Sequence, residues 1–517
     1  MGSGLVCSEK YLKTLYSTTV FVSSGLLLVL EMVAGRILAP YVGVSLYTWT
    51  SIIGVILGGV SLGNWVGGVA ADRGWGHSKV GWLLGGSSVS GLMVLPLMVL
   101  SGGAVQQYEL DLLSASFVYV LILFFLPAVF LGTITPIITT LYLAMSDQTG
   151  KVVGRMHALA ALGSILGTFA TGFYLVQWFG TRAIVVGVGA VLAAFAVLFF
   201  LIGKRSGPNA IGFVAVLVVV LGWMFAANGF ANPCRVESNY YCLRVIDEHD
   251  GLGELYARTL VLDHMAHSTN VKDDPDVLWT PYVQIMDKLI EEHFTQAGRD
   301  MGELNYFFAG GGAYTHPRAL LSRYPKAGVT VSEIDESVTQ FSKAHLFFDD
   351  NDMTIHHSDT RIVMSKLEDQ SYDVVVTDVF HDVGIPYHLT TLEYGQLVRQ
   401  KLADDGLYLL NVIDVFPSQA LVQAMVHTLK GSFPYVGVWM EKPDSEEEIR
   451  VTFVLSASNR PITDDLLVTS GYDGRVWYNV EGFIGQQIAR NGEMLLTDNY
   501  APVERLLSRL LNTSIGN

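Results

Sequence analysis

The feature that most constrains the fold of this chain is a series of seven apolar segments within its first 233 residues. Each has about 20 mostly apolar residues, the length that a helix needs to cross a lipid bilayer. The segments cover residues 14–34, 46–70, 80–101, 115–143, 156–178, 183–202 and 209–230. No short apolar region with a cleavage site precedes them, so we expect the first segment to be a retained span rather than a signal peptide. The sequence therefore predicts a multi-pass α-helical membrane bundle.

Charge divides the chain where these segments end. Residues 1–233 carry a net charge of +4 and residues 234–517 carry −20, so only the second part has the composition of a water-soluble domain. Basic loops favour the cytoplasmic side of a membrane. Two basic loop residues, Arg36 and Arg182, fall on one side of the bundle, and eight fall on the other: Lys10, Lys13, Arg73, Lys79, Lys151, Arg155, Lys204 and Arg205. We therefore expect a cytoplasmic N-terminus and, after an odd number of spans, an extracytoplasmic soluble domain.

Small residues and cysteines leave two questions open. Glycines spaced by four occur in the second and fifth segments and let helix backbones approach closely, either within the bundle, which we favour, or in a dimer. They are Gly54, Gly58, Gly59, Gly63, Gly67, Gly163 and Gly167. Cys234 and Cys242 follow the last segment. They form a disulfide if that side is oxidising and remain two thiols if it is cytoplasmic.

The soluble half has the pattern of an α/β domain. Residues 240–262 indicate a hairpin around a turn at 250–253, and residues 281–294 have the apolar spacing of a helix. Strand and helix patterns then alternate, with strands at 305–309, 328–332, 353–356, 372–377 and 406–412. This order predicts a Rossmann-like, doubly wound parallel sheet that binds ligands at the carboxyl ends of its strands. We expect three domains: residues 1–232, a hairpin subdomain at 233–270, and the Rossmann-like domain at 271–517.

Two features indicate the ligand. Gly310, Gly311 and Gly312 follow the first strand of the alternating pattern and allow a ligand to approach the backbone. Glu333 ends the next strand, where an acid commonly binds ribose hydroxyls. Together they favour an adenosine-type ligand over the alternative of a tight turn and a solvated carboxylate.

The order of several motifs resembles that of spermidine synthases, which are polyamine aminopropyltransferases. These motifs are Glu237-Ser238-x-Tyr240, Leu262-Asp263-His264, Tyr282, the three glycines, Glu333-Ile334-Asp335, Asp359 and the Asp378–Pro386 segment. Residues 30–43, 127–136, 154–168 and 495–504 resemble bacterial proteins in which transporter-like helices are fused to such a domain. The resemblance implies an enzyme of the bacterial inner (plasma) membrane.

The resemblance also implies roles for individual residues. Glu333 would bind the ribose of decarboxylated S-adenosylmethionine and Asp359 its adenine amino group. Asp378 would take the proton of the attacking amine, and Tyr282 would position the donor and the acceptor. The implied partners are a polyamine or other cationic small molecule and the lipid bilayer, with a homodimer left open. We expect no permanently bound cofactor, no metal and no nucleic acid.

Departures from the family pattern affect the aminopropyl end of the expected ligand. The family loop GGGDGG has an Asp that holds the aminopropyl nitrogen, and Ala313 stands there, followed by Tyr314, which we expect to add bulk beside the ligand. His267 replaces a family Gln in the nucleoside site, and the catalytic loop is lengthened to include Asp382. Three functions remain open. The first is an aminopropyltransferase in which Asp382 or another acid replaces the lost one. The second is a transferase or lyase that uses intact S-adenosylmethionine, and the third is an inactive binding domain coupled to a transporter-like bundle.

Overall fold

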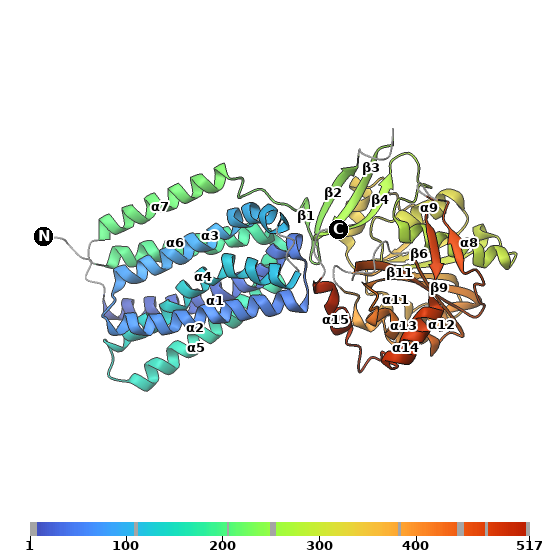
Figure 1. Cartoon of the computed structure of the whole chain (residues 1–517). Coiled ribbons are helices and arrows are strands. Elements are labelled where there is room, and N and C mark those ends of the chain that lie inside the picture. Colours follow the sequence, from blue (N-terminus) through green and yellow to red (C-terminus); the bar gives the residue numbers. More distant parts are fainter. Residues whose placement is uncertain are drawn as a thin grey trace. The chain divides into compact units, whose positions relative to one another are not determined.

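The structure, a computed structural model, describes residues 8–107, 112–203, 206–248, 255–380, 384–441, 449–470 and 474–512. It divides into two compact units, one extending to Pro233 and one beginning at Cys234 (Figure 1). The division falls where the apolar segments end, because each unit buries its own apolar residues. The two units are described separately below.

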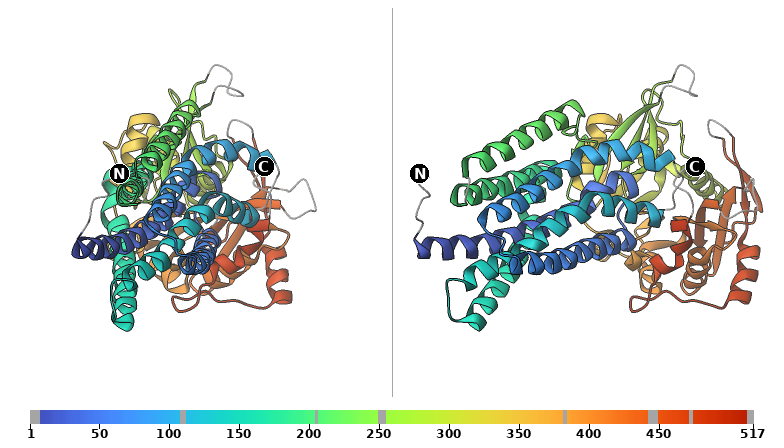
Figure 2. Two further views of the ribbon diagram at one scale, coloured as in Figure 1. Left: turned by 90° about the vertical axis from the view of Figure 1, so that its left-hand side faces the viewer. Right: turned by 60° about the vertical axis from the view of Figure 1, so that its left-hand side comes forward.

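The first unit is a bundle of long helices that run side by side (Figures 1 and 2). They are α1 (Glu9–Val42), α2 (Leu46–Asp72), α3 (His77–Gln107), α4 (Leu112–Leu143), α5 (Thr149–Ala170), α6 (Val176–Ile202) and α7 (Ser206–Ala226). A π-helical turn, Thr171–Leu175, joins α5 to α6. The principal packing pairs are α2 with α4, α1 with α5, and α3 with α6.

The lengths of these helices agree with a membrane-spanning bundle. Six helical segments of the described residues are long and apolar enough to cross a membrane. One of them, Thr149–Ile202, has 54 residues and contains Gly180, whose φ of 70° and ψ of 162° are not helical. The chain bends there, and this residue separates the fifth and sixth predicted spans.

Glycines bring helix backbones together inside the bundle. A Cβ added at Gly63 would lie 2.3 Å from the carbonyl oxygen of Val129 on α4, and one added at Gly163 would lie 2.0 Å from that of Phe21 on α1. Only glycine fits at such distances, so these residues serve packing within the bundle. Gly54 and Gly58 differ, because nothing lies within 4 Å of an added Cβ at either position.

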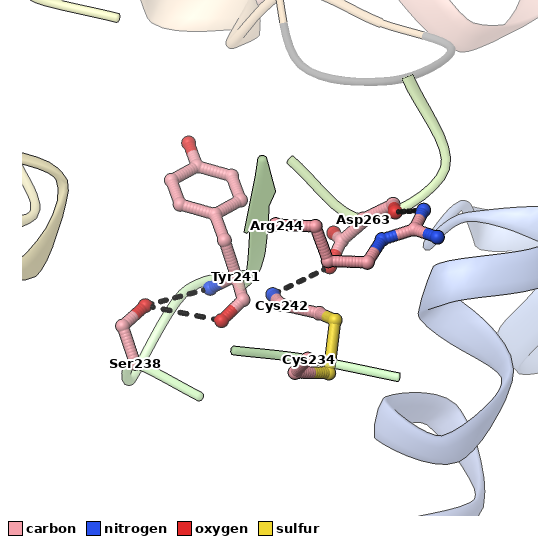
Figure 3. The surroundings of a disulfide bond; sticks show 6 residues. All are labelled: Cys234, Ser238, Tyr241, Cys242, Arg244 and Asp263. Atoms are coloured by element: carbon pink, nitrogen blue, oxygen red, sulfur yellow. Dashed lines mark hydrogen bonds between the residues drawn. A yellow bond between two sulfur atoms is a disulfide. The ribbon is translucent and has the colours of Figure 1, made fainter. Parts of the chain in front are cut away.

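The second unit begins with a four-stranded antiparallel sheet of order β1-β2-β3-β4. Its strands are β1 (Val236–Glu237), β2 (Cys242–Glu248), β3 (Ala257–Leu262) and β4 (Met265–Val271). The pairing of β2 with β3 confirms the predicted hairpin, whose turn lies outside the described residues. A disulfide joins Cys234 to Cys242, and the amide of Cys242 donates to Asp263 Oδ1 at 2.9 Å (Figure 3).

A nine-stranded sheet of order β12-β13-β10-β11-β9-β8-β5-β6-β7 forms the centre of this unit. Its strands are β5 (Asn305–Ala309), β6 (Gly328–Ser332), β7 (Thr354–His356), β8 (Tyr372–Thr377), β9 (Leu402–Phe416), β10 (Tyr435–Glu441), β11 (Ile449–Ser458), β12 (Leu466–Val468) and β13 (Val476–Asn479). Strands β5 to β9 pair in parallel, as predicted. The sheet continues beyond β9 with four strands that were not predicted, β11, β10, β13 and β12, and these pair antiparallel. The domain is therefore Rossmann-like with a mixed sheet.

Helices cover both faces of this sheet. Helix α8 (Pro281–Gln296) and helix α9 (Thr315–Arg323) pack against the face that includes Tyr306 and Phe308. Helices α12 (Leu392–Lys401), α13 (Ala420–Lys430) and α14 (Glu481–Asn491) pack against the face that includes Phe307. Alternate residues of β5 therefore serve two separate cores, as expected for a sheet buried on both faces. Among the described residues of this unit, the other α-helices are α10 (Glu336–His345), α11 (Thr360–Met364) and α15 (Val503–Leu506).

Candidate active site

Three neighbouring parallel strands end together at one edge of the nine-stranded sheet. Ala309 of β5 is paired with Ser332 of β6 and with Thr377 of β8. The residues that follow are Gly310, Glu333 and Asp378, so the sheet register brings the glycine loop and two carboxylates to one place. This is the edge where doubly wound sheets bind ligands.

The backbone at this edge requires a glycine. Gly310 has a φ of +94°, and a Cβ there would lie 2.1 Å from the carbonyl oxygen of Asp378. The amide of Gly310 donates to Ser332 O at 2.9 Å, and the amide of Asp378 donates to Ala309 O at 2.8 Å. A side chain at position 310 would force these strand ends apart.

Asp378 is held by two side chains from different elements. Tyr282 of α8 donates its hydroxyl to Asp378 Oδ2 at 2.8 Å, and Asn411 of β9 donates Nδ2 to Oδ1 at 3.0 Å. Burial raises the pKa of Asp378, and the two hydrogen bonds oppose that rise. Burial and the neighbouring carboxylate raise the pKa of Tyr282. Each Asp378 oxygen keeps a lone pair with which to accept a proton or a further hydrogen bond.

Glu333 is buried and bound to the backbone around it. Its Oε2 accepts from the amide of Gly311 at 2.8 Å, and its Oε1 accepts from the amide of Asp335 at 3.0 Å. Burial raises the pKa of Glu333, while these amides oppose the rise. The carboxylate is therefore fixed beside the glycine loop, where a ribose would lie in a nucleoside complex.

Asp359 caps the short helix α11 and pairs with a histidine. Its Oδ1 accepts from the amides of Arg361 and Ile362 at 2.9 and 3.2 Å. Its Oδ2 lies 2.8 Å from Nε2 of His388, which belongs to the segment that follows Asp378. Both oxygens of Asp359 therefore have partners that fix the orientation of the carboxylate.

Tyr314 lies against the glycine loop, because a Cβ added at Gly311 would lie 2.6 Å from Cζ of its ring. The side chain is fully buried and stacks on Phe348 with a centroid distance of 4.0 Å. Its hydroxyl lies 2.6 Å from Thr339 Oγ1. Tyr314 takes this direction because its φ of 58° turns the chain at the start of α9.

Ala313 is also buried, in an apolar cluster between the hairpin and α10. The cluster consists of Leu243, Leu260, Leu262, Ala313, Val338, Phe341 and Leu346. Asn270 of β4 donates its side-chain amide to the carbonyl oxygen of Ala313 at 2.8 Å. The missing carboxylate has thus been replaced by apolar packing.

The other predicted residues are distributed as follows. His267 lies on β4, partly buried, at the point where the pairing with β3 shifts register. Asp382 lies outside the described residues. Gly311 and Gly312 complete the loop, and Ser342 donates its hydroxyl to the carbonyl oxygen of Gly312 at 3.1 Å.

Several residues at this edge were not predicted from the sequence. Asn411 is one, although it is the one amide in the apolar run from Leu407 to Ile413, which could have marked it. Ser268, whose hydroxyl bonds to Tyr282, lacked such a signal. Tyr241 is the third residue that was not predicted. Burial and the nearby carboxylates of Glu333, Asp263 and Asp335 raise the pKa of its hydroxyl.

At this edge of the sheet, two buried acceptor atoms lack a hydrogen-bond partner among the described residues. They are Oδ1 of Asn411 and Oδ2 of Asp335, in residues that are each 4% exposed. A buried acceptor without a donor is unfavourable by roughly 1–3 kcal/mol. Each of these atoms is able to accept a hydrogen bond from an N–H or O–H group.

Fold and site together define a Rossmann-like ligand-binding domain joined in one chain to an apolar helical bundle. Residues 310–457 match the model of the spermine/spermidine synthase domain. The C-terminal part of the chain therefore carries a domain of this family, as the motifs predicted.

Two curated relatives are similar to part of the chain. The probable polyamine aminopropyl transferase of Bifidobacterium longum is 25% identical over 217 residues, which are 38% of this chain and 47% of that protein. The polyamine aminopropyltransferase of Vibrio vulnificus is 32% identical over 105 residues, 20% of this chain and 34% of that protein. The chain thus spans less than half the length of either relative.

Solved structures give more distant likenesses. A probable spermidine synthase from Corynebacterium glutamicum is 19% identical, and the match covers 53% of this chain and 99% of that one, with a TM-score of 0.46. A spermidine synthase in complex with the transition-state analogue AdoDATO is 15% identical, with coverages of 43% and 74% and a TM-score of 0.31.

Proposed function

We propose that the chain is a membrane-bound aminopropyltransferase. It would transfer an aminopropyl group from decarboxylated S-adenosylmethionine to an amine of a polyamine and release methylthioadenosine. The observation that carries this proposal is Asp378, a carboxylate held by Tyr282 and Asn411 beside the glycine loop. A carboxylate so placed is suited to accept a proton from an amine nucleophile.

The chemistry balances with the groups at this edge. A neutral amine attacks the aminopropyl carbon attached to the sulfonium, so an N–C bond forms as the C–S bond breaks. The electron pair of the broken bond passes to sulfur, which leaves as the neutral thioether methylthioadenosine. The amine becomes cationic and loses its proton to Asp378, whose raised pKa favours that transfer.

Two carboxylates are suited to the nucleoside. Glu333, fixed by the loop amides, would accept hydrogen bonds from the ribose hydroxyls. Asp359, fixed by the start of α11, would accept from the adenine amino group. The free acceptor on Asn411 would take a hydrogen bond from the amine, beside the base that deprotonates it.

The burial of Ala313 favours a second candidate, a transferase or lyase that uses intact S-adenosylmethionine. The apolar cluster offers no carboxylate at position 313 to hold an aminopropyl ammonium. Loss of a hydrogen bond to a charged group typically weakens binding by about 1.5–3 kcal/mol. The binding of a donor whose ammonium group is held by residues other than position 313 would not be weakened in this way.

We further propose that the second unit faces an oxidising compartment, outside the cytoplasm. One support is the Cys234–Cys242 disulfide (Figure 3). The other is the excess of basic residues in the loops on the N-terminal side of the bundle. Structural disulfides persist in oxidising compartments and are rare in the cytosol. A cationic donor made in the cytoplasm would then need a route across the membrane.

The test uses the full chain purified in detergent. Decarboxylated or intact S-adenosylmethionine is supplied with a mixture of putrescine and spermidine, and methylthioadenosine and the polyamine products are followed by mass spectrometry. Release from the decarboxylated donor with an aminopropylated product supports the first candidate, and release only from the intact donor supports the second. No release from either donor by folded protein contradicts both.

A further inference from the structure

The C-terminal segment Leu496–Tyr500, here called the strap, is tied to the elements that hold Asp359. Leu496 is fully buried; its carbonyl oxygen accepts from the amide of Leu392 at 2.8 Å, and its amide donates to Thr428 Oγ1 at 3.0 Å. Thr497 and Tyr500 exchange backbone hydrogen bonds of 3.0 and 2.9 Å, which close the strap into a tight turn. The strap thus has a defined conformation, with Asp498 at its centre.

Asp498 binds three groups from the neighbouring elements. Its two oxygens accept from the guanidinium of Arg361 at 2.7 and 2.6 Å, a bidentate pair. Oδ1 also accepts from the hydroxyl of Thr391 at 2.8 Å, and the amide of Asp498 donates to Glu393 Oε2 at 3.0 Å. Arg361 lowers the pKa of Asp498, so the pair is ionised at neutral pH. A bidentate pair fixes the orientation of the guanidinium relative to the carboxylate as well as the distance between them.

Arg361 connects the strap to both oxygens of Asp359. Its backbone amide donates to Asp359 Oδ1 at 2.9 Å, and its Nη1 donates to the carbonyl oxygen of His388 at 3.1 Å. The ring of that histidine lies 2.8 Å from Asp359 Oδ2. Asp498 therefore holds, through the guanidinium of Arg361, two of the three residues that bind the Asp359 carboxylate.

We propose that Asp498 is a positioning residue for nucleoside binding. It fixes the side chain of Arg361, which binds the backbone of His388. Through these two residues it orients the Asp359 carboxylate and holds the chain at His388, in the segment that follows Asp378. The proposal rests on the proposed nucleoside-binding role of Asp359. Because Asp498 acts on a binding group rather than on the proton acceptor, its loss raises KM for the donor and leaves kcat nearly unchanged.

The test compares Asp498→Asn, Arg361→Gln and the double variant with Asp405→Asn in the full chain in detergent. Asp405 serves as the control because both of its carboxylate oxygens accept from Nη1 of Arg299, at 3.2 and 2.9 Å. It lies at the opposite edge of the sheet, near the start of β9. The side chains of Asp405 and Asp498 are 35% and 40% exposed. Methylthioadenosine affinity is measured by calorimetry, and KM and kcat by product release.

Asp498→Asn and Arg361→Gln should each weaken methylthioadenosine binding and raise KM by about tenfold, the effect of losing one charge-assisted hydrogen bond. The double variant should be no worse than either single variant, because the two residues act as one unit. Asp498→Glu should recover part of the affinity. Asp405→Asn should change neither the dissociation constant of methylthioadenosine nor KM for the donor. The proposal would be overturned if Asp498→Asn had the same dissociation constant and the same KM as wild type.

A second measurement separates this proposal from the proposed function. The amides of Arg361 and Ile362 donate to Asp359, so their hydrogen exchange reports the position of its carboxylate without any ligand. Faster exchange in Asp498→Asn than in Asp405→Asn supports the positioning role even if wild type binds no methylthioadenosine, a result that would contradict only the nucleoside site. Unchanged exchange together with unchanged binding would refute the positioning role.

Discussion

Asp378→Asn tests the chemistry most directly, because it removes the proton acceptor and preserves the shape of the side chain. The Tyr282 hydroxyl can still donate to the amide oxygen, while the amide nitrogen would face the Nδ2 donor of Asn411. A positioned general base typically contributes 10²–10⁴-fold to rate, or about 3–5 kcal/mol of barrier. We therefore expect kcat to fall by about that factor, with methylthioadenosine affinity retained.

The pH dependence supplies an independent signature of the same residue. The active form of Asp378 is ionised, and burial raises its pKa above the ordinary value for an aspartate. In wild type, kcat/KM for the donor at saturating polyamine should therefore decline as the pH falls through that raised pKa. Asp378→Asn should lack this decline, because the group that titrates has been removed.

The matched control is Asp373→Asn, at the other end of the same strand. Asp373 is buried and accepts from Arg299 Nη2 at 2.9 Å and from the amide of Asn305 at 2.8 Å. Its replacement should lower the melting temperature and leave kcat unchanged in the folded protein. The reasoning would be refuted if Asp378→Asn kept wild-type kcat, or if the two variants lost activity in equal proportion to their loss of stability.

Two further predictions concern the donor side of the site. Glu333→Gln should weaken methylthioadenosine binding by about tenfold or more in calorimetry, because ribose hydroxyls would lose a charged acceptor; unchanged affinity would place the ribose elsewhere. Ala313→Asp should destabilise the second unit by about 3 kcal/mol or more, since an unpaired carboxylate would enter the apolar cluster around Leu260. A melting temperature equal to that of Ala313→Ser would show that the loop opens position 313 to water.

The sequence predicted those parts of the fold that depend on local pattern. Seven apolar segments, the hairpin, and strands β5, β6 and β8 were found because periodicity and length mark them. The glycine loop and Glu333 were found because a strand end, a glycine turn and an acid occur in a fixed order. The antiparallel strands β10 to β13 were missed, since they lack the alternation with helices that identified the parallel strands.

The features of the site that were not predicted have a different cause, because they depend on contacts between distant residues. The direction of Tyr314 depends on its left-handed backbone and on Phe348, which lies 34 positions away in the chain. Arg361 and Asp498 are separated by 137 positions, so no local pattern connects them. Such pairs are specified by tertiary packing, and the sequence shows only that each residue is polar.

The side of the membrane can be tested with the three cysteines of the chain. If the second unit is extracytoplasmic, a membrane-impermeant maleimide should label Cys234 and Cys242 in intact cells only after treatment with an impermeant reductant, because the disulfide protects both thiols. Cys7 is the internal control: it precedes the first span, on the side predicted to be cytoplasmic, and should react only in lysed cells. Labelling of Cys7 in intact cells, with no labelling of Cys234 and Cys242 after reduction, would reverse the proposed orientation. The nucleoside site would then face the compartment where adenosyl donors are made, and no route across the membrane would be required.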